Sequence, residues 1–555
     1  MFECPNCGGH VVFDPKLQKM RCEFCDSVFD PTPEDLAEQS GDAGNVLVHE
    51  ATDQYETNVF TCPQCGGEIL SDDATAVTFC SFCGASTVLE GRLAKIKKPD
   101  YIIPFTKTKE DAQKEYEKVI RRSLFAPSAM KRDTVVERFR GIYMPYWVYD
   151  FKIDGDVMVE GQVDHRRGDY IYHDHYNIQS ELHAHYDGVS FDASSSFSDT
   201  LSGAIAPYDC KQKKDFSKEY FAGFYGDTSD IPMSVYKSTA RNIVKADAAG
   251  RLIKSGDYRR YGATAYNAMG AVTPDEESGA IGYFPVWFLA NRNGERVSYA
   301  VVNGQTGKVA VDVPISYGKY LIGVLILALP IFLLLNFFAT ITPGVAIGIT
   351  MVLAIISAIL NGVLQRKIFI RENYLDDAGM QNLAKKEAAR AKRAAQREAD
   401  AQGGNVPPMP DEDMDDMEET TVAPSRSVAG TIGLIACVLL GVILVFYMGF
   451  VGALVAAGIY HMGHMVSEKN VKVVTEAPRP STPFSQFFGS IWKPLLGIVV
   501  GLVILVWSPV SDLYYYGAGV ICMCLVGWSF YDVVMRHNRF TTRPLPQFNK
   551  RGGDK

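Results

Sequence analysis

Hydrophobic and polar residues follow two different patterns along this 555-residue chain. Up to about residue 316, short apolar stretches with strand or helix spacing alternate with polar segments. From about residue 320 onward, long apolar runs alternate with short charged segments. A helix needs about 20 apolar residues to cross a bilayer, and several of these runs reach that length. The pattern therefore predicts a multidomain protein with a soluble first part and an all-α transmembrane second part.

The apolar runs predict three transmembrane helical hairpins, at residues 320–364, 427–465 and 491–534. Charged connections separate them: a cytoplasmic charged helix with an acidic linker (365–426), a further linker (466–490) and a basic tail (535–555). Their Lys and Arg residues place these connections, and both termini, in the cytoplasm by the positive-inside rule. The middle run is long for one span and short for two, so five or six crossings remain open.

Residues 100–316 predict a cytoplasmic α+β domain. Its first segment has helical spacing, and Thr108 can cap that helix. Two later segments repeat a strand that begins with a Pro-x-Trp motif, at Pro145 and Trp147 and again at Pro285 and Trp287. Each is followed by Asp-Gly or Asn-Gly, dipeptides that favour a two-residue hairpin turn. We expect both tryptophans to be core or interface anchors.

Eight of the twelve cysteines occur in two units that share one spacing, C-x2-C, fourteen residues, C-x2-C. The units are Cys4, Cys7, Cys22 and Cys25, and then Cys62, Cys65, Cys80 and Cys83. Two such knuckles facing each other complete a tetrahedral four-thiolate site for Zn(II). The spacing predicts two small β zinc ribbons, at 1–30 and 58–92, joined by an acidic linker at 31–57. With four protein ligands, each zinc is expected to be structural; disulfides or an iron–sulfur site are the alternatives.

Five of the ten histidines fall between His165 and His185. If the strands in this segment pair with each other, four imidazoles would come together: His173, His175, His183 and His185. Such a cluster could form a weak metal site or a pH sensor. The alternative is a polar strand face whose histidines have no special role.

The charge distribution argues against nucleic-acid binding. The formal net charge is −9, and residues 1–90 contain sixteen Asp or Glu but only three Lys or Arg. Phosphate binding depends on cationic side chains that displace counterions. The ribbons lack them, so we expect protein partners rather than DNA or RNA.

Catalytic signatures are missing from the sequence. We find no phosphate-binding loop, no H-E-x-x-H or G-x-S-x-G motif, and no dinucleotide fingerprint after a strand. The predicted spans carry no Asp, Glu, Lys or Arg at mid-depth, whereas ion pumps and many transporters need such groups. These observations favour a non-enzymatic anchor or assembly platform.

The two cysteine units, the segments "MPYWVYD", "IAPYD" and "YFAGFYGD", and the apolar second half resemble a bacterial family of TFIIB-type double zinc-ribbon membrane proteins, the YdjG-like family. The resemblance implies a multi-pass protein of the bacterial inner membrane. It also implies protein partners of the SPFH (flotillin-like) or phage-shock-protein-A-like kind, in envelope stress.

Three functions follow as hypotheses. The first is a membrane scaffold whose cytoplasmic ribbons and α+β domain recruit protein partners, in which a homo-oligomer is possible. The second is a channel or transporter gated by the cytoplasmic domain. The third is a membrane-tethered nucleic-acid-binding protein, which the acidic ribbons make the weakest of the three.

Overall fold

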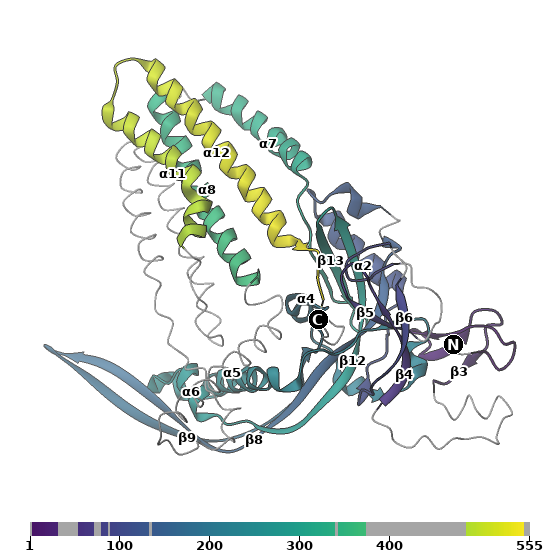
Figure 1. Cartoon of the computed structure of the whole chain (residues 1–555). Coiled ribbons are helices and arrows are strands. Elements are labelled where there is room, and N and C mark those ends of the chain that lie inside the picture. The colour runs from purple at the N-terminus through teal and green to yellow at the C-terminus, as the bar shows by residue number, and fades with distance from the viewer. Residues whose placement is uncertain are drawn as a thin grey trace, which may run out of the picture. The chain divides into compact units, whose positions relative to one another are not determined.

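The computed structural model describes residues 3–31, 54–71, 79–86, 89–132, 136–338, 342–372 and 484–548 (Figure 1). These residues belong to two compact units. The first unit contains the described residues up to 313 together with 542–548, and the second contains those from 314 to 372 and from 484 to 541. The predicted hairpin at 427–465 lies outside the described residues, as do most of the linkers on either side of it.

The first cysteine-rich region is a three-stranded antiparallel sheet of β1 (Val11–Asp14), β2 (Lys19–Cys22) and β3 (Val28–Phe29). Val11 and Phe13 lie on the same face of β1 and are buried. The ring of Phe13 packs edge-on against Tyr220, with 5.2 Å between the ring centroids. One face of this sheet therefore attaches the region to the rest of the first unit.

A twelve-stranded sheet forms the framework of the first unit. The order β10-β7-β12-β8-β11-β5-β4-β6 gives its main path, β9 pairs with β8, and β13 joins β12, β14 and β15. The strands are β4 (Gln54–Thr61), β5 (Glu68–Ser71), β6 (Glu90–Lys97), β7 (Tyr101–Ile102), β8 (Arg140–Arg167), β9 (Tyr170–Asp192), β10 (Lys214–Asp215), β11 (Tyr225–Gly226), β12 (Asp275–Asn293), β13 (Arg296–Asn303), β14 (Val309–Val311) and β15 (Arg543–Pro544).

The second cysteine-rich region belongs to this large sheet. β4 pairs with β5 and β6, and β5 pairs with β11, which lies beside β8. All four residues of β5 are buried, so this strand needs cover on both of its faces. The predicted boundaries of 58–92 treat the second ribbon as a small domain of its own, whereas its strands continue the framework of the α+β region.

β8 and β9 form a long two-stranded ribbon (Figure 1). β8 continues through Asp154 and Gly155, where the sequence predicts a hairpin turn, and that prediction is wrong. The turn lies at Gly168, between the paired residues Arg167 and Tyr170, and Gly168 has φ +66°. The second predicted turn is confirmed, because Asn293 and Arg296 face each other across Gly294.

In the described part of the first unit, four α-helices pack on the sheet: α2 (Lys109–Arg122), α4 (Asp199–Ile205), α5 (Lys237–Ser255) and α6 (Ala265–Ala271). α2 has the predicted cap, a reciprocal capping box between Thr108 and Asp111. α5 and α6 pack against β8. Single 3-10 turns complete the described part of the unit, at Ser128–Lys131, Cys210–Gln212, Lys218–Phe221, Met233–Val235 and Asp257–Tyr261.

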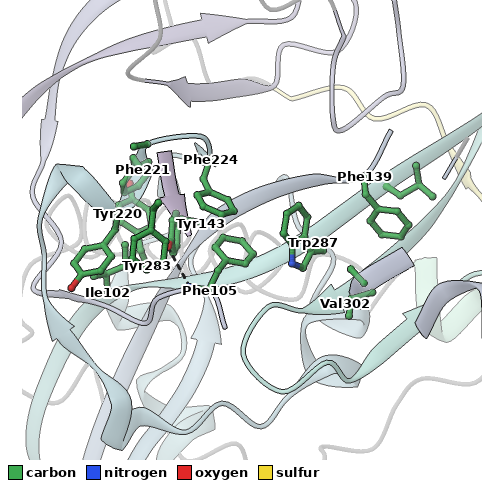
Figure 2. Close-up of a cluster of buried hydrophobic side chains, with 14 of the residues drawn as sticks. Ile102, Phe105, Phe139, Tyr143, Tyr220, Phe221, Phe224, Tyr283, Trp287 and Val302 are labelled. Atoms are coloured by element: carbon green, nitrogen blue, oxygen red, sulfur yellow. Dashed lines mark hydrogen bonds between the residues drawn. The ribbon is translucent and has the colours of Figure 1, made fainter. Parts of the chain in front are cut away.

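Aromatic side chains fill the core between these elements (Figure 2). Phe105 stacks on Phe224 at a centroid distance of 4.3 Å and also contacts Trp287. Trp287 donates its indole N–H to the carbonyl of Lys107 at 2.9 Å, and Trp147 donates to that of Ile231 at 2.6 Å. Both repeated tryptophans are thus core anchors, as predicted.

The described part of the second unit is all-α. It contains α7 (Tyr317–Phe338), α8 (Pro343–Ile370), α11 (Phe484–Trp507) and α12 (Asp512–Thr541), and the last three pack against one another. Three helices are long and apolar enough to cross a membrane, at Pro343–Ile370, Ser485–Trp507 and Asp512–Thr541. The predicted arrangement as three hairpins stays a prediction.

Two charged residues lie near the ends of the last two predicted spans, and not at mid-depth, where the sequence predicts none. Lys493 of α11 and Asp532 of α12 form an ion pair with 2.5 Å between Nζ and Oδ2, and their side chains are only 13% and 21% exposed. The ammonium group also lies 4.0 Å from the ring centre of Trp528. A carboxylate and an indole face thus compensate the lysine charge.

Candidate metal centres

The first centre is built from two matching knuckles. In the first knuckle, Cys4 accepts a hydrogen bond from the backbone N–H of Gly8 at 2.8 Å and donates to the carbonyl of Gly9 at 2.7 Å. Gly8 has φ +69°, the left-handed conformation that closes the turn and that glycine adopts without steric cost. In the second knuckle, Asp26 takes the same conformation with φ +56° and bonds back to Cys22.

The second centre repeats this geometry. Gly66 donates to Cys62 at 2.8 Å with φ +72°, and Gly84 donates to Cys80 at 3.0 Å with φ +71°. Glycine therefore closes three of the four turns, and an aspartate closes the fourth. Asp is one of the few non-glycine residues that visits this conformation readily.

The sulfur atoms of each centre fit one metal ion. The Sγ–Sγ distances are 3.6 Å for Cys4–Cys25 and 3.5 Å for Cys7–Cys22. In the second centre they are 3.8 Å for Cys62–Cys83 and 3.7 Å for Cys65–Cys80. A tetrahedron with metal–sulfur bonds of about 2.3 Å has edges of about 3.8 Å, close to all four values. Both groups of four thiols are compatible with metal binding.

The two centres differ in their exposure to solvent. All four cysteines of the second centre are buried, among side chains that include Phe82 and Phe288. In the first centre Cys4 and Cys22 are buried, whereas Cys7 and Cys25 are exposed. The second centre is thus part of a hydrophobic core, and the first has one open side.

Ser27 stabilises the ionised form of the exposed thiol of Cys25. Its hydroxyl lies 3.2 Å from the sulfur. The Ser27 hydroxyl and backbone amide, together with Cys7, lower the pKa of Cys25 to about 6. The thiolate is the form that binds metal, and within the same group of thiols the hydrogen bonds from Cys25 and Cys22 raise the pKa of Cys7.

The four histidines do not come together. They lie along one continuous strand, β9, and the segment that contains them does not fold back on itself. His173 and His183 are ten residues apart, which is about 33 Å along an extended strand. Each pairs separately, His173 with Asp164 at 2.6 Å and His183 with Asp154. Within the described ranges, the two cysteine groups are the clusters that could hold a metal ion.

Individual acid–histidine pairs remain along the ribbon. Asp154, and then Glu181, raise the pKa of His183. His185 lies 2.5 Å from Asp187 and 3.3 Å from Glu277. These are exposed ion pairs, which contribute little to stability. A role in sensing pH stays a prediction.

One buried acidic group has no signature in the sequence. Asp192, at the end of β9, is 3% exposed, and its Oδ2 atom has no hydrogen-bond partner. Burial raises the pKa of Asp192 well above its usual range, and the neighbouring Asp199 raises it further. The alternation of exposed and less exposed residues along β9 places Asp192 on the inward face. Nothing in the sequence pattern predicts a carboxyl group at an inward position.

The chain is similar to the uncharacterized protein YdjG of Bacillus subtilis strain 168. The two are 25% identical over 329 residues, which is 57% of this chain and 91% of that protein. No protein-family model matches the chain, and no solved structure matches it. The match agrees with the resemblance predicted from the cysteine units, at the level of a distant likeness.

Proposed function

We propose that this chain is a non-enzymatic membrane scaffold whose two centres each hold a structural Zn(II) ion. Four thiolates at tetrahedral distances are the ligand set that Zn(II) takes in ribbon domains, with no position left open for a substrate. One observation carries the proposal: the closed centres occur in the same chain as three helices of membrane length. A closed metal site holds a binding surface in shape, and apolar helices fix that surface at a bilayer.

The proposed partners are proteins. Residues 1–90, which include both ribbons and their linker, carry sixteen acidic and three basic residues, and the first ribbon has an open side at Cys7 and Cys25. By the resemblance to YdjG-like proteins, we propose SPFH-domain or phage-shock-protein-A-like partners. The proposed setting is the bacterial inner membrane, with the first unit in the cytoplasm and a role in envelope stress.

A pull-down from solubilised membranes tests this proposal. The tagged intact protein is compared with a Cys7→Ser, Cys25→Ser variant, which removes the first centre and leaves the second intact. Cys210→Ser serves as a control, because Cys210 belongs to neither centre. We expect partners with the intact protein and the control and a loss with the double variant. The same partners with all three proteins would refute recruitment through the first ribbon.

Metal analysis tests the centres themselves. The purified protein should contain two zinc ions per chain, and the Cys7→Ser, Cys25→Ser variant should contain one. Iron in place of zinc, or a metal-free protein with two disulfides per ribbon, would refute the proposed structural zinc.

The ion pair of Lys493 and Asp532 favours a second candidate function, a channel or transporter. Ionisable groups within membrane helices often line a transport path. Beside the pair, Asn361 donates to the hydroxyl of Ser529 at 3.0 Å and accepts from Arg536 at 3.1 Å. Flux through proteoliposomes that depends on Asp532 would support this second function, and tight proteoliposomes would count against it.

A further inference from the structure

The two ribbons share more than their cysteines. Phe24 and Phe82 occupy the same position, between the last two cysteines of each unit. In each ribbon this ring lies directly over the second knuckle glycine, Gly9 or Gly67, so that a Cβ atom there would collide with it. Each ribbon thus presents one face that consists of a glycine pair and a phenylalanine ring.

In the second ribbon this face is occupied by a distant part of the same chain. The backbone N–H of Phe548 donates to the carbonyl of Cys65 at 2.6 Å. Its ring packs edge-on against Phe82, with centroids 5.9 Å apart and an interplanar angle of 74°. A Cβ atom at Gly66 would collide with the carbonyl of Phe548, so the segment lies directly on the knuckle.

The segment that carries Phe548 is also fixed upstream. β15 pairs with β13, and Arg543 forms an ion pair with Asp312, in which the two side chains are 11% and 15% exposed. Arg296 donates to the hydroxyl of Thr542 at 2.6 Å. The occupant of the second ribbon is therefore an extended strand held along residues 542–548, which ends with a phenylalanine on the knuckle.

In the first ribbon the matching face is open. The side chain of Phe24 is 78% exposed, whereas Phe82 is 0% exposed. A Cβ atom at Gly8 would meet nothing within 4 Å, in contrast to Gly66. The buried face of the first ribbon, with Cys4 and Cys22, belongs to the core cluster, whereas Cys7, Cys25 and Phe24 are exposed.

Charge indicates which occupant suits the open face. Residues 3–31 contain five Asp or Glu and three Lys or Arg, and four thiolates around a divalent ion add negative charge. Lys19 pairs with Asp30 at 3.0 Å and Arg21 with Asp26 at 2.6 Å. Glu23, beside Phe24, has a side chain that is 58% exposed. The segment on the second ribbon belongs to the stretch "RPLPQFNKR", which has three basic and no acidic residues.

We propose that the open face of the first ribbon binds an extended, basic segment of a partner protein that carries a phenylalanine. Its backbone N–H would donate to the carbonyl of Cys7, and its ring would pack on Phe24. Phe548 makes the two corresponding contacts in the second ribbon, with the carbonyl of Cys65 and the ring of Phe82. This proposal rests on the proposed role of the first ribbon in recruiting proteins, and it names the chemistry of the recruited segment.

Peptide binding to the full-length protein in detergent tests the proposal. The probe is a fluorescent peptide of residues 543–551, titrated by fluorescence anisotropy. We expect saturable binding at one site and a loss of at least about tenfold in affinity for Phe24→Ala, typical of truncating an aromatic anchor. Leu17→Ala is the matched control, because Leu17 is 50% exposed on the same ribbon, and it should bind like the wild type. A peptide with alanine in place of phenylalanine should bind at least about tenfold more weakly.

A second variant separates the two faces. Phe548→Ala removes the ring from the second ribbon but leaves the backbone of residues 542–548 on its knuckle, so the number of peptide sites should stay at one. No saturable binding to the wild type, or binding that Phe24→Ala leaves unchanged, would overturn the proposal. If the protein forms a dimer and the peptide dissociates it, the open face binds the same segment of a second copy of this chain. The proposal of a partner protein is then wrong. A failed peptide titration with a positive pull-down would reject this face and keep the scaffold function.

Discussion

At the scale of single residues, the spacing of the cysteines correctly predicts which thiols come together in two groups of four, each compatible with metal binding. Two cysteines in a C-x2-C turn lie on one side of a knuckle for reasons local to four residues, so spacing alone identifies all eight thiols. The contact between Phe548 and Cys65 had no such signal. It joins residues 483 positions apart through a backbone hydrogen bond, which any residue but proline can donate.

The difference in exposure predicts two rates of metal loss. A thiol-reactive reagent reaches Cys7 and Cys25 directly, whereas the second centre must first open within the core. We expect one equivalent of metal to leave quickly and the other at least about tenfold more slowly, because opening a core costs well over 1 kcal/mol. A colorimetric zinc indicator follows the release. Cys7→Ser should abolish the fast phase, and equal rates for both ions would contradict the assignment.

Asp192 predicts a dependence of stability on pH. Because its pKa is raised in the folded protein, the folded state binds the proton more tightly than the unfolded state does. The resulting stabilisation is present below the unfolded pKa, about 4, and is lost as the pH rises through the folded value. Asp192→Asn should therefore remove this loss and raise the free energy of unfolding at pH 8 by at least about 1 kcal/mol.

Denaturant unfolding of the wild type and Asp192→Asn between pH 4 and pH 8 measures this effect. The exposed Asp169 provides the control, since Asp169→Asn should leave the pH profile of the wild type unchanged. If Asp192→Asn is less stable than the wild type at every pH, the carboxyl group of Asp192 is ionised in the folded protein and its charge is stabilised there. That result would contradict the prediction.

At the scale of elements, local signals succeeded where they agreed with long-range pairing. The capping box of α2 and the turn at Gly294 are both confirmed. The Asp-Gly dipeptide at Gly155 failed because alternation of buried and exposed residues continues past it, and β8 there pairs with β9 residue by residue. Many cross-strand pairs outweigh a turn preference of two residues. The same continuity of β9 separates the histidines that the sequence groups together.

The ion pair between α11 and α12 predicts a non-additive pattern of mutations. Asp532→Leu leaves the half-buried ammonium of Lys493 without its carboxylate, which is costly in an apolar setting. The double variant Lys493→Leu, Asp532→Leu removes both charges and should be more stable than the single variant by about 2 kcal/mol. Thermal unfolding in detergent completes the double-mutant cycle. Additive losses would show that the two charges act independently.

At the scale of the whole molecule, the sequence divides the chain correctly into a mixed first part and an apolar second part. It does not show that the strands of the second ribbon continue into the large sheet, because the spacing identifies the cysteines and not the partners of the strands between them. β4 and β5 find their partners in a sheet whose central strands come from residues 140–167 and 275–293. Such non-local pairing leaves no local pattern.

The two centres should therefore contribute unequally to stability. Loss of the second centre removes a metal from the core beside Phe288, whereas loss of the first affects a peripheral sheet. We expect Cys62→Ser to lower the free energy of unfolding by at least about 3 kcal/mol more than Cys7→Ser does. That difference is a fraction of the roughly 10–16 kcal/mol that structural zinc provides to zinc-finger peptides. Limited proteolysis of the two variants checks this, and equal protection would contradict it.

The pairing of β15 with β13 has a topological consequence. β13 precedes the membrane region and β15 follows it, yet Arg296 faces Pro544 and Val297 faces Arg543 across one sheet. Strands cannot hydrogen-bond through a bilayer, so for a chain that crosses one, this pairing predicts that residues 313 and 542 lie on the same side. For a chain that crosses a bilayer between these residues, the pairing predicts an even number of crossings. Six crossings satisfy this prediction and five do not, so one short strand gives a test of the predicted membrane topology.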